Sequence, residues 1–209
     1  MAFEVISGAA TSANDLIDAM AANWEFDTED TTSTNHSVTW GTVTIKQYSS
    51  TVMNIMKGDT ALLDRADVAS ATTTYTIYKA TNAMLVCLHY NGYDNNDYCF
   101  GILITRNTSL VNPANTEKIV FVENYASSGV NVPKYGSDLK TYTSNTTSNN
   151  LFVLCTEGMQ VFPFVQPNGA YMSDNAYIVT RANSNTLMTT VTFGGETYAV
   201  CYGMAIKEE

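Results

Sequence analysis

The chain has 209 residues and a formal net charge of −10, with 20 acidic and 10 basic side chains. Only 14% of its residues are charged and 45% are hydrophobic, a balance that excludes a disordered chain. The acidic surface repels phosphate groups, and no apolar run approaches the roughly 18 residues of a membrane span. Neither nucleic acid nor a membrane is therefore expected as a partner.

The neutral polar residues point to β structure. The chain holds 29 Thr and 13 Tyr, which favour strands, together with 20 Asn and 15 Ser, which favour turns. We expect a mainly β protein: a single domain over residues 1–209, built as an antiparallel β-sandwich or jelly-roll-like fold with one N-terminal α-helix.

The helix is predicted over about residues 12–23. Ser12 offers an N-cap, and Asp15, three residues later, completes a short-armed capping box. Apolar residues then recur at helical spacing, at Leu16, Ile17, Met20 and Trp24. The polar, acidic stretch 25–35 that follows is expected to be a loop.

Short strands separated by polar turns are predicted downstream. Side chains alternate between the two faces of a strand, so in one regular strand Val38 and Trp40 would lie on one face and Val43 and Ile45 on the other. A β-bulge at Gly41 is therefore expected to bring all four onto one face. Further strands are expected at Val52–Met56, Thr73–Lys79, Lys118–Tyr125, Leu151–Thr156, Gln160–Val165, Ala176–Arg181 and Leu187–Phe193. The polar run 137–150 is predicted to be a long exposed loop.

Two strands, Ala83–Tyr90 and Tyr98–Arg106, are apolar on both faces and are predicted to be central. A sheet that is apolar on both faces must be covered on both. One short helix cannot cover both outer faces of a sandwich, so neighbouring subunits are the expected cover, and the chain is expected to be an oligomer.

The last strand is predicted to run unbroken over Thr197–Lys207, after a two-residue turn at Gly194-Gly195. One of its sides carries only small residues, on which the helix or a neighbouring subunit is expected to approach closely. This predicted assembly face consists of Ala199, Cys201, Gly203 and Ala205.

The four cysteines have apolar neighbours and form no C-x-x-C pair, so they are interpreted as buried free thiols. A bridge between Cys87 and Cys99 across a hairpin is the alternative. The start of the chain lacks the features of a secretory signal, and folding in a cytoplasm is expected.

No motif for catalysis, phosphate binding or metal binding is present in the sequence. Neither His36 nor His89 has a second histidine or a cysteine at metal-ligand spacing, and no G-x-S-x-G motif occurs. Glu123 is the best strand-borne acid, but an outward-facing strand residue is the simpler interpretation. We expect a protein that is not an enzyme and has no cofactor and no metal.

Aromatic and carboxamide side chains gather around one predicted turn. These residues are Tyr90, Tyr93, Asp94, Asn95, Asn96, Asp97 and Tyr98. Rings that stack and amides that hydrogen-bond are typical of glycan or protein recognition, so this loop is a candidate for a cell-surface receptor or glycan. Cross-strand packing and turn formation explain the same residues.

The opening MAFEVISGAATSANDLIDAM resembles the start of tailed-bacteriophage virion proteins, in which a short strand and a small-residue turn lead into a helix. Trp40-Gly41-Thr42-Val43 occupies the place of the Trp-containing strand that follows in those proteins. The resemblance covers about the first 45 residues. It implies a structural subunit of a tail, baseplate or head that assembles with itself and with other virion proteins. The alternative is a receptor- or carbohydrate-binding β-sandwich module.

Overall fold

The computed structural model describes residues 3–68, 73–90, 98–124, 134–135, 160–165, 171–180, 188–201 and 204–208. In chain order, the elements are β1 (Glu4–Ala9), α1 (Ala13–Ala21), β2 (Thr28–Asp30), β3 (Ser37–Trp40), β4 (Val43–Ser49), β5 (Val52–Lys57), β6 (Thr60–Asp67), β7 (Thr73–Lys79), β8 (Ala83–Tyr90), β9 (Tyr98–Ser109), β10 (Thr116–Asn124), β11 (Lys134–Tyr135), β12 (Gln160–Val165), β13 (Tyr171–Thr180), β14 (Met188–Phe193), β15 (Glu196–Cys201) and β16 (Met204–Lys207).

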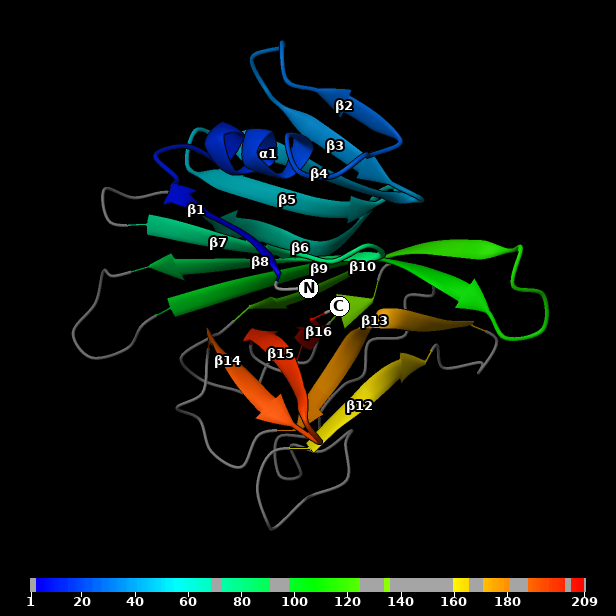
Figure 1. Cartoon of the computed structure of the whole chain (residues 1–209). Coiled ribbons are helices and arrows are strands. Elements are labelled where there is room, and N and C mark those ends of the chain that lie inside the picture. The colour runs from blue at the N-terminus through cyan, green and yellow to red at the C-terminus, as the bar shows by residue number, and fades with distance from the viewer. Residues whose placement is uncertain are drawn as a thin grey trace, which may run out of the picture.

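The described strands form two antiparallel sheets, which confirms the predicted antiparallel β-sandwich. The smaller sheet is a meander in the order β2-β3-β4-β5-β6, and the larger has the path β1-β7-β8-β9-β13-β16-β15-β14. Figure 1 shows the smaller sheet and α1 above the central strands, with β12 to β16 below them. The larger sheet therefore turns back on itself beyond β9.

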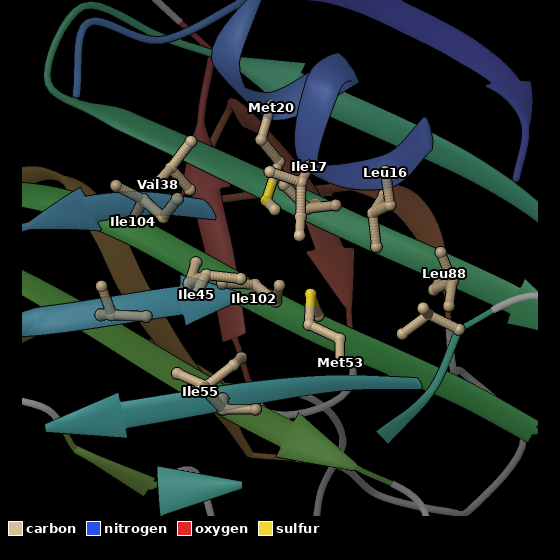
Figure 2. Close-up of a cluster of buried hydrophobic side chains, with 14 of the residues drawn as sticks. Leu16, Ile17, Met20, Val38, Ile45, Met53, Ile55, Leu88, Ile102 and Ile104 are labelled. Carbon is tan, nitrogen blue, oxygen red and sulfur yellow. The ribbon is translucent and has the colours of Figure 1, made fainter. Parts of the chain in front are cut away.

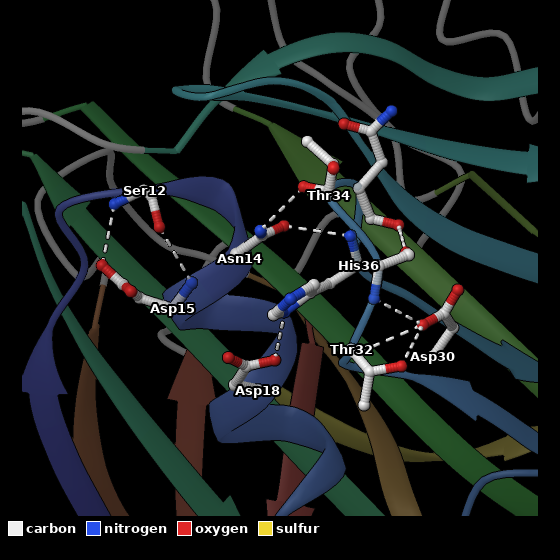
Figure 3. A network of polar contacts seen from close by, with 10 residues as sticks. Ser12, Asn14, Asp15, Asp18, Asp30, Thr32, Thr34 and His36 are labelled. Carbon is white, nitrogen blue, oxygen red and sulfur yellow. Dashed lines mark hydrogen bonds and ion pairs between the residues drawn. The ribbon is translucent and has the colours of Figure 1, made fainter.

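The single helix of the described chain begins as predicted. Ser12 is the N-cap: its hydroxyl accepts the Asp15 N–H at 3.1 Å, and the Asp15 carboxylate accepts the Ser12 N–H at 2.8 Å (Figure 3). The helix ends at Ala21, two residues before the predicted end at 23.

The polar stretch 25–35 is not wholly a loop, because it contains β2, which pairs with β3. The turn after β2 is anchored to the helix (Figure 3). The Asn14 carboxamide accepts the His36 N–H at 3.1 Å and donates to the Thr34 carbonyl at 3.2 Å. The His36 ring also meets the Asp18 carboxylate, with Nδ1 and Oδ1 2.6 Å apart. Polar contacts with α1 thus order a segment in which apolar periodicity gave no signal.

The predicted bulge at Gly41 is a hairpin turn instead. β3 and β4 pair antiparallel, with Trp40 opposite Val43, and Gly41 adopts φ 62° in the turn between them. A two-residue reversal places both members of a cross-strand pair on the same face, so the parity change along the sequence needs no inserted residue. The expectation that all four apolar residues share one face is correct, since Val38, Trp40, Val43 and Ile45 are all buried in one cluster.

The central strands are apolar on both faces, as predicted. Alternate residues of β8 and β9 enter two different clusters: Val86 and Ile102 pack beneath α1 and the smaller sheet, and Leu85 and Leu103 pack against β13, β15 and β16. Figure 2 shows Leu16, Ile17 and Met20 of α1 pointing into the first cluster. Both faces are therefore covered by the chain itself, and the expectation that neighbouring subunits supply the cover is wrong.

The predicted last strand is two strands. The predicted turn at Gly194-Gly195 is confirmed, but β15 ends at Cys201 and pairs antiparallel with β16, with Cys201 opposite Met204. Because the chain reverses between β15 and β16, the residues of the predicted assembly face no longer share one side of a single strand. Ala199 and Cys201 pack in the cluster under the central strands, whereas Ala205 packs with Tyr198 and Val200.

The small residues do allow a close approach, but to a strand of the same chain. A Cβ built on Gly101 of β9 would lie 2.9 Å from Cys201 Sγ and 2.6 Å from Met204 Cε. Cys87 and Cys201 are buried and neither belongs to a disulfide, and Cys87 lies opposite Gly101 in the β8–β9 register. The alternative bridge from Cys87 to Cys99 is therefore not formed.

Several expectations fall on other parts of the chain. The loop at 137–150 and the strand at Leu151–Thr156 lie outside the described residues, as does Gly203.

β6 was not predicted from the sequence. Within the described chain, no helix has the length and apolar character needed to span a membrane.

Candidate functional site

Strands β9 and β10 form a projecting hairpin, here called the arm and defined as residues 106–118. The ladder between β9 and β10 continues as far as the pair Thr108 and Thr116. β8 pairs with β9 only up to Thr105, and beyond that point the start of β13 takes its place beside Asn107 to Ser109. Figure 1 shows the arm extending away from the sandwich, in green.

Hydrogen bonds from two side chains shape the loop at the tip of the arm. The Ser109 hydroxyl accepts the N–H groups of Val111 at 3.3 Å and Asn112 at 3.1 Å. The Asn112 carboxamide accepts the Ala114 N–H at 3.3 Å, and the Asn115 N–H donates to the Asn112 carbonyl at 2.9 Å. These bonds satisfy the turn's backbone locally, so the loop has a defined conformation.

This ordered loop presents two apolar side chains to solvent. Val111 is 89% exposed and Leu110 is 54% exposed. Residues 107–116 include no charged side chain. Two adjacent exposed apolar side chains on a projecting, uncharged loop make this tip a candidate protein-binding surface.

The root of the arm is built around Trp40, which is 1% exposed. Arg106 and Lys118 face each other across β9 and β10 and place their cations 5.6 Å and 4.5 Å from the centre of the Trp40 ring. Trp24 and Phe26 pack edge-on against the same ring, and its Nε1–H donates to the Thr105 carbonyl at 3.1 Å. The arm is thus fixed to the β3–β4 hairpin of the smaller sheet.

Asp27 contacts both the arm and the β3–β4 turn at the base of the arm. Its carboxylate forms an ion pair with Lys118 and accepts the Gly41 N–H at 2.7 Å. The hydrogen bond from Lys118 is the largest cause that lowers the pKa of Asp27 below its ordinary value. The carboxylate is therefore ionised at neutral pH and joins the β3–β4 turn to the arm.

A buried polar cluster holds β13 beside the arm. The hydroxyls of Thr105 and Ser173 lie 2.9 Å apart, and Ser173 Oγ also accepts the Ala176 N–H at 2.9 Å. The Asn107 side chain is fully buried next to them, and its Oδ1 lies 3.3 Å from the Thr105 hydroxyl. These contacts stabilise the point along β9 at which its neighbouring strand changes from β8 to β13.

Two tyrosines of the predicted receptor loop lie directly opposite each other, because the β8–β9 register pairs Tyr90 with Tyr98. The remaining residues of this candidate site, Tyr93 to Asp97, lie outside the described residues. Among the members of the predicted assembly face, Ala199, Cys201 and Ala205 are fully buried within the chain.

Sequence reasoning missed the arm. Trp40, Arg106 and Lys118 are far apart in the chain and meet only because β10 returns beside β9. A usable signal was present, since the run from Asn107 to Thr116 is uncharged and contains Leu110 and Val111 within a turn-forming sequence.

Within the described ranges, no group of three or more His, Cys, Asp or Glu side chains is placed to hold a metal ion. The arm combines an exposed apolar tip, Leu110 and Val111, with a base that is held by Trp40 and Asp27. No protein-family model matches this chain, and no curated protein or solved structure is significantly similar to it.

Proposed function

We propose that this chain is a non-enzymatic structural subunit of a bacteriophage particle, in the tail, the baseplate or the capsid-associated layer. It is made in the bacterial cytoplasm and works through protein–protein assembly. The resemblance of the first 45 residues to virion proteins supports the class of particle. The arm supports the mode of action.

The single observation that carries the assembly function is the exposure of Val111 and Leu110 on an ordered tip. Transfer of a Val or Leu side chain from water into a packed interface contributes about 1.5–3 kcal/mol. A loop that is already ordered loses little conformational freedom on docking, so more of that gain appears as affinity. The partner that fits this tip is another protein of the particle with an apolar socket.

The charge distribution is compatible with this partner. The chain as a whole carries a net charge of −10, but the arm beyond Glu117 and Arg106 is uncharged. An interface core that is depleted in charge avoids the cost of desolvating ions. The tip is therefore a place where a second acidic protein can approach without strong repulsion.

The test is to replace Leu110 and Val111 by Ser in the particle that contains the chain. Neither side chain makes a hydrogen bond, so the double variant keeps the local bonds of the tip. We expect the purified particles to lack this variant, or to contain much less of it. Tyr48→Ser is the matched control, because Tyr48 is another large, half-exposed apolar side chain (52% exposed) that lies outside the arm. Wild-type incorporation of the double variant, or absence of the chain from every purified particle, would contradict the proposal.

A receptor- or carbohydrate-binding module is the second candidate. The pairing of Tyr90 with Tyr98 favours it, because it places two aromatic residues at the base of the 91–97 connection. Glycan-array binding that is lost in Tyr90→Ala and Tyr98→Ala, with no effect of the arm variants, would favour this function over assembly.

A further inference from the structure

The strand β1 forms an open edge of the larger sheet. Among the described strands, β1 pairs only with β7, and it is the last strand on its side of the sheet. Val5 is 54% exposed, and Ser7 and Ala9 are exposed as well. The residues between them, Ile6 and Gly8, are partly buried.

The register defines which backbone groups of β1 point outward. The Ala10 N–H donates to the Thr73 carbonyl at 3.1 Å, which makes these two residues a hydrogen-bonded pair. Hydrogen-bonded pairs alternate along an antiparallel ladder. The N–H and C=O groups of Gly8 and Ile6 therefore face β7, whereas those of Val5, Ser7 and Ala9 face away from the sheet.

This edge carries none of the usual protection against pairing. In many proteins, proline, a β-bulge or an exposed lysine prevents an edge strand from pairing with a strand of another chain. β1 contains neither proline nor lysine, and its ladder with β7 runs without a shift in register. Its one charged residue, Glu4, is paired with Lys79 across the ladder, with the Nζ–Oε2 distance 3.3 Å.

We infer that β1 pairs antiparallel with β1 of a second copy of this chain, about a two-fold axis at Ser7. This register places Ser7 opposite Ser7 of the second copy, and Val5 opposite its Ala9. All outward N–H and C=O groups of Val5, Ser7 and Ala9 then find partners on both copies. The two larger sheets join into one continuous sheet.

A second copy fits this edge for two reasons. A two-fold interface requires a surface that complements itself, and a register centred on Ser7 uses every outward backbone group of β1. The edge is also locally neutral, because Glu4 and Lys79 compensate each other. Copies of a chain with net charge −10 repel each other least where the surface carries no excess charge. The inference extends the proposed assembly function, but it uses a different surface from the arm.

The first experiment tests the register with charges. Val5→Lys with Ala9→Lys places lysine opposite lysine on both sides of the axis, whereas Val5→Lys with Ala9→Glu places lysine opposite glutamate. Both double variants alter the same exposed positions, and in an extended strand residues 5 and 9 are too far apart to pair within one chain. By light scattering coupled to size exclusion, we expect the Lys/Lys variant to have half the molar mass of the wild type. The Lys/Glu variant keeps the wild-type mass.

The second experiment is Ser7→Cys under mild oxidation. Residues of a hydrogen-bonded pair have Cα atoms about 5.5 Å apart, within the range of a disulfide. We expect a covalent dimer for Ser7→Cys and none for Val5→Cys, whose partner position is Ala9.

A wild-type chain that remains monomeric at high concentration overturns the inference, as does equal molar mass for the Lys/Lys variant and the wild type. A monomeric wild type whose Lys/Lys variant fails to enter the particle also overturns it, because the edge then binds another protein. Failure of the arm proposal is distinguishable, because Leu110→Ser with Val111→Ser leaves the dimer intact.

Discussion

Gly41 lies directly against Lys118: a Cβ on Gly41 would be 3.0 Å from Lys118 Cβ and 3.1 Å from the Lys118 carbonyl oxygen. The β3–β4 turn therefore touches the backbone of the arm. Gly41 also has φ +62°, a conformation that other residues adopt at a cost. This glycine thus serves both the turn and the attachment of the arm.

We predict that Gly41→Ala lowers the free energy of unfolding more than Gly58→Ala does. Gly58 has a similar φ of +55°, but no atom lies within 4 Å of its built Cβ. Gly58→Ala therefore reports the backbone cost alone, about 1–3 kcal/mol, and Gly41→Ala adds the clash with Lys118. Urea denaturation of both variants measures the difference. Equal losses would mean that the arm moves away from the turn without cost.

The ion pair at the root of the arm is expected to matter less than the backbone contact of the same carboxylate. Asp27 and Lys118 are about one-third exposed, at 35% and 33%, so their pairing contributes roughly 0.2–1 kcal/mol. Asp27→Ala also removes the acceptor for the Gly41 N–H. We expect Asp27→Ala to destabilise the protein more than Lys118→Met, and a double-mutant cycle by thermal denaturation separates the two terms. A cycle in which Lys118→Met costs more would place the main contribution in the Lys118–Trp40 contact.

Acid is expected to weaken the protein through Asp15 and Asp27. The hydrogen bond from the Thr11 hydroxyl is the largest cause that holds the pKa of Asp15 below its ordinary 3.8, and the bond from Lys118 does the same for Asp27. Because these pKa values are depressed in the folded state, the stabilisation is complete at neutral pH. It is lost as the pH falls below 3.8 towards the folded values.

Asp15→Asn combined with Asp27→Asn should therefore reduce the slope of unfolding free energy against pH below pH 3.8. Urea titrations across this window measure the slope. Gly58→Ala is the control: it destabilises the protein through the backbone alone, by about 1–3 kcal/mol, and touches neither carboxylate, because no atom lies within 4 Å of its built Cβ. An unchanged slope in the double variant would assign the acid sensitivity to other groups.

Gly101→Ala is predicted to be destabilising, and Cys201→Ala is predicted to relieve part of that loss. The added methyl group would lie 2.9 Å from Cys201 Sγ, whereas Cys201 Cβ is 3.7 Å away. Removal of the sulfur therefore relieves one of the two close contacts, and the other, 2.6 Å to Met204 Cε, is with the flexible end of a side chain. A coupling of about 0.5–3 kcal/mol between the two substitutions is expected in a double-mutant cycle. Simple additivity would show that β9 and β15 separate on substitution.

Local signals in the sequence predicted much of the fold. The capping box at Ser12 and Asp15, the turn at Gly194-Gly195 and the two-sided strands β8 and β9 each follow from a short run of residues. These features depend on neighbours in the chain, so one sequence is enough to find them.

The errors came from features that depend on partners distant in sequence. Residues 198–206 are all apolar or glycine, so the sequence fits one two-sided strand as well as two strands, and Gly203 is the only turn-forming residue among them. Which elements bury the two faces of the central strands was equally impossible to predict. The sequence shows that both faces of β8 must be buried, but it does not show that α1 covers one face and β15 the other.

Because β9 pairs with β8 along its first part and with β13 along its last part, the strands of the larger sheet are expected to assemble in a particular order. The β2–β6 meander joins neighbours along the chain, and such short loops close fast. β13 finds its edge only beside the last residues of β9, after β8 has occupied the first part of that edge. During synthesis the N-terminal half is therefore able to gain its own sheet while the ribosome still holds the C-terminal strands, and closure of the second layer is the slow, late step of folding.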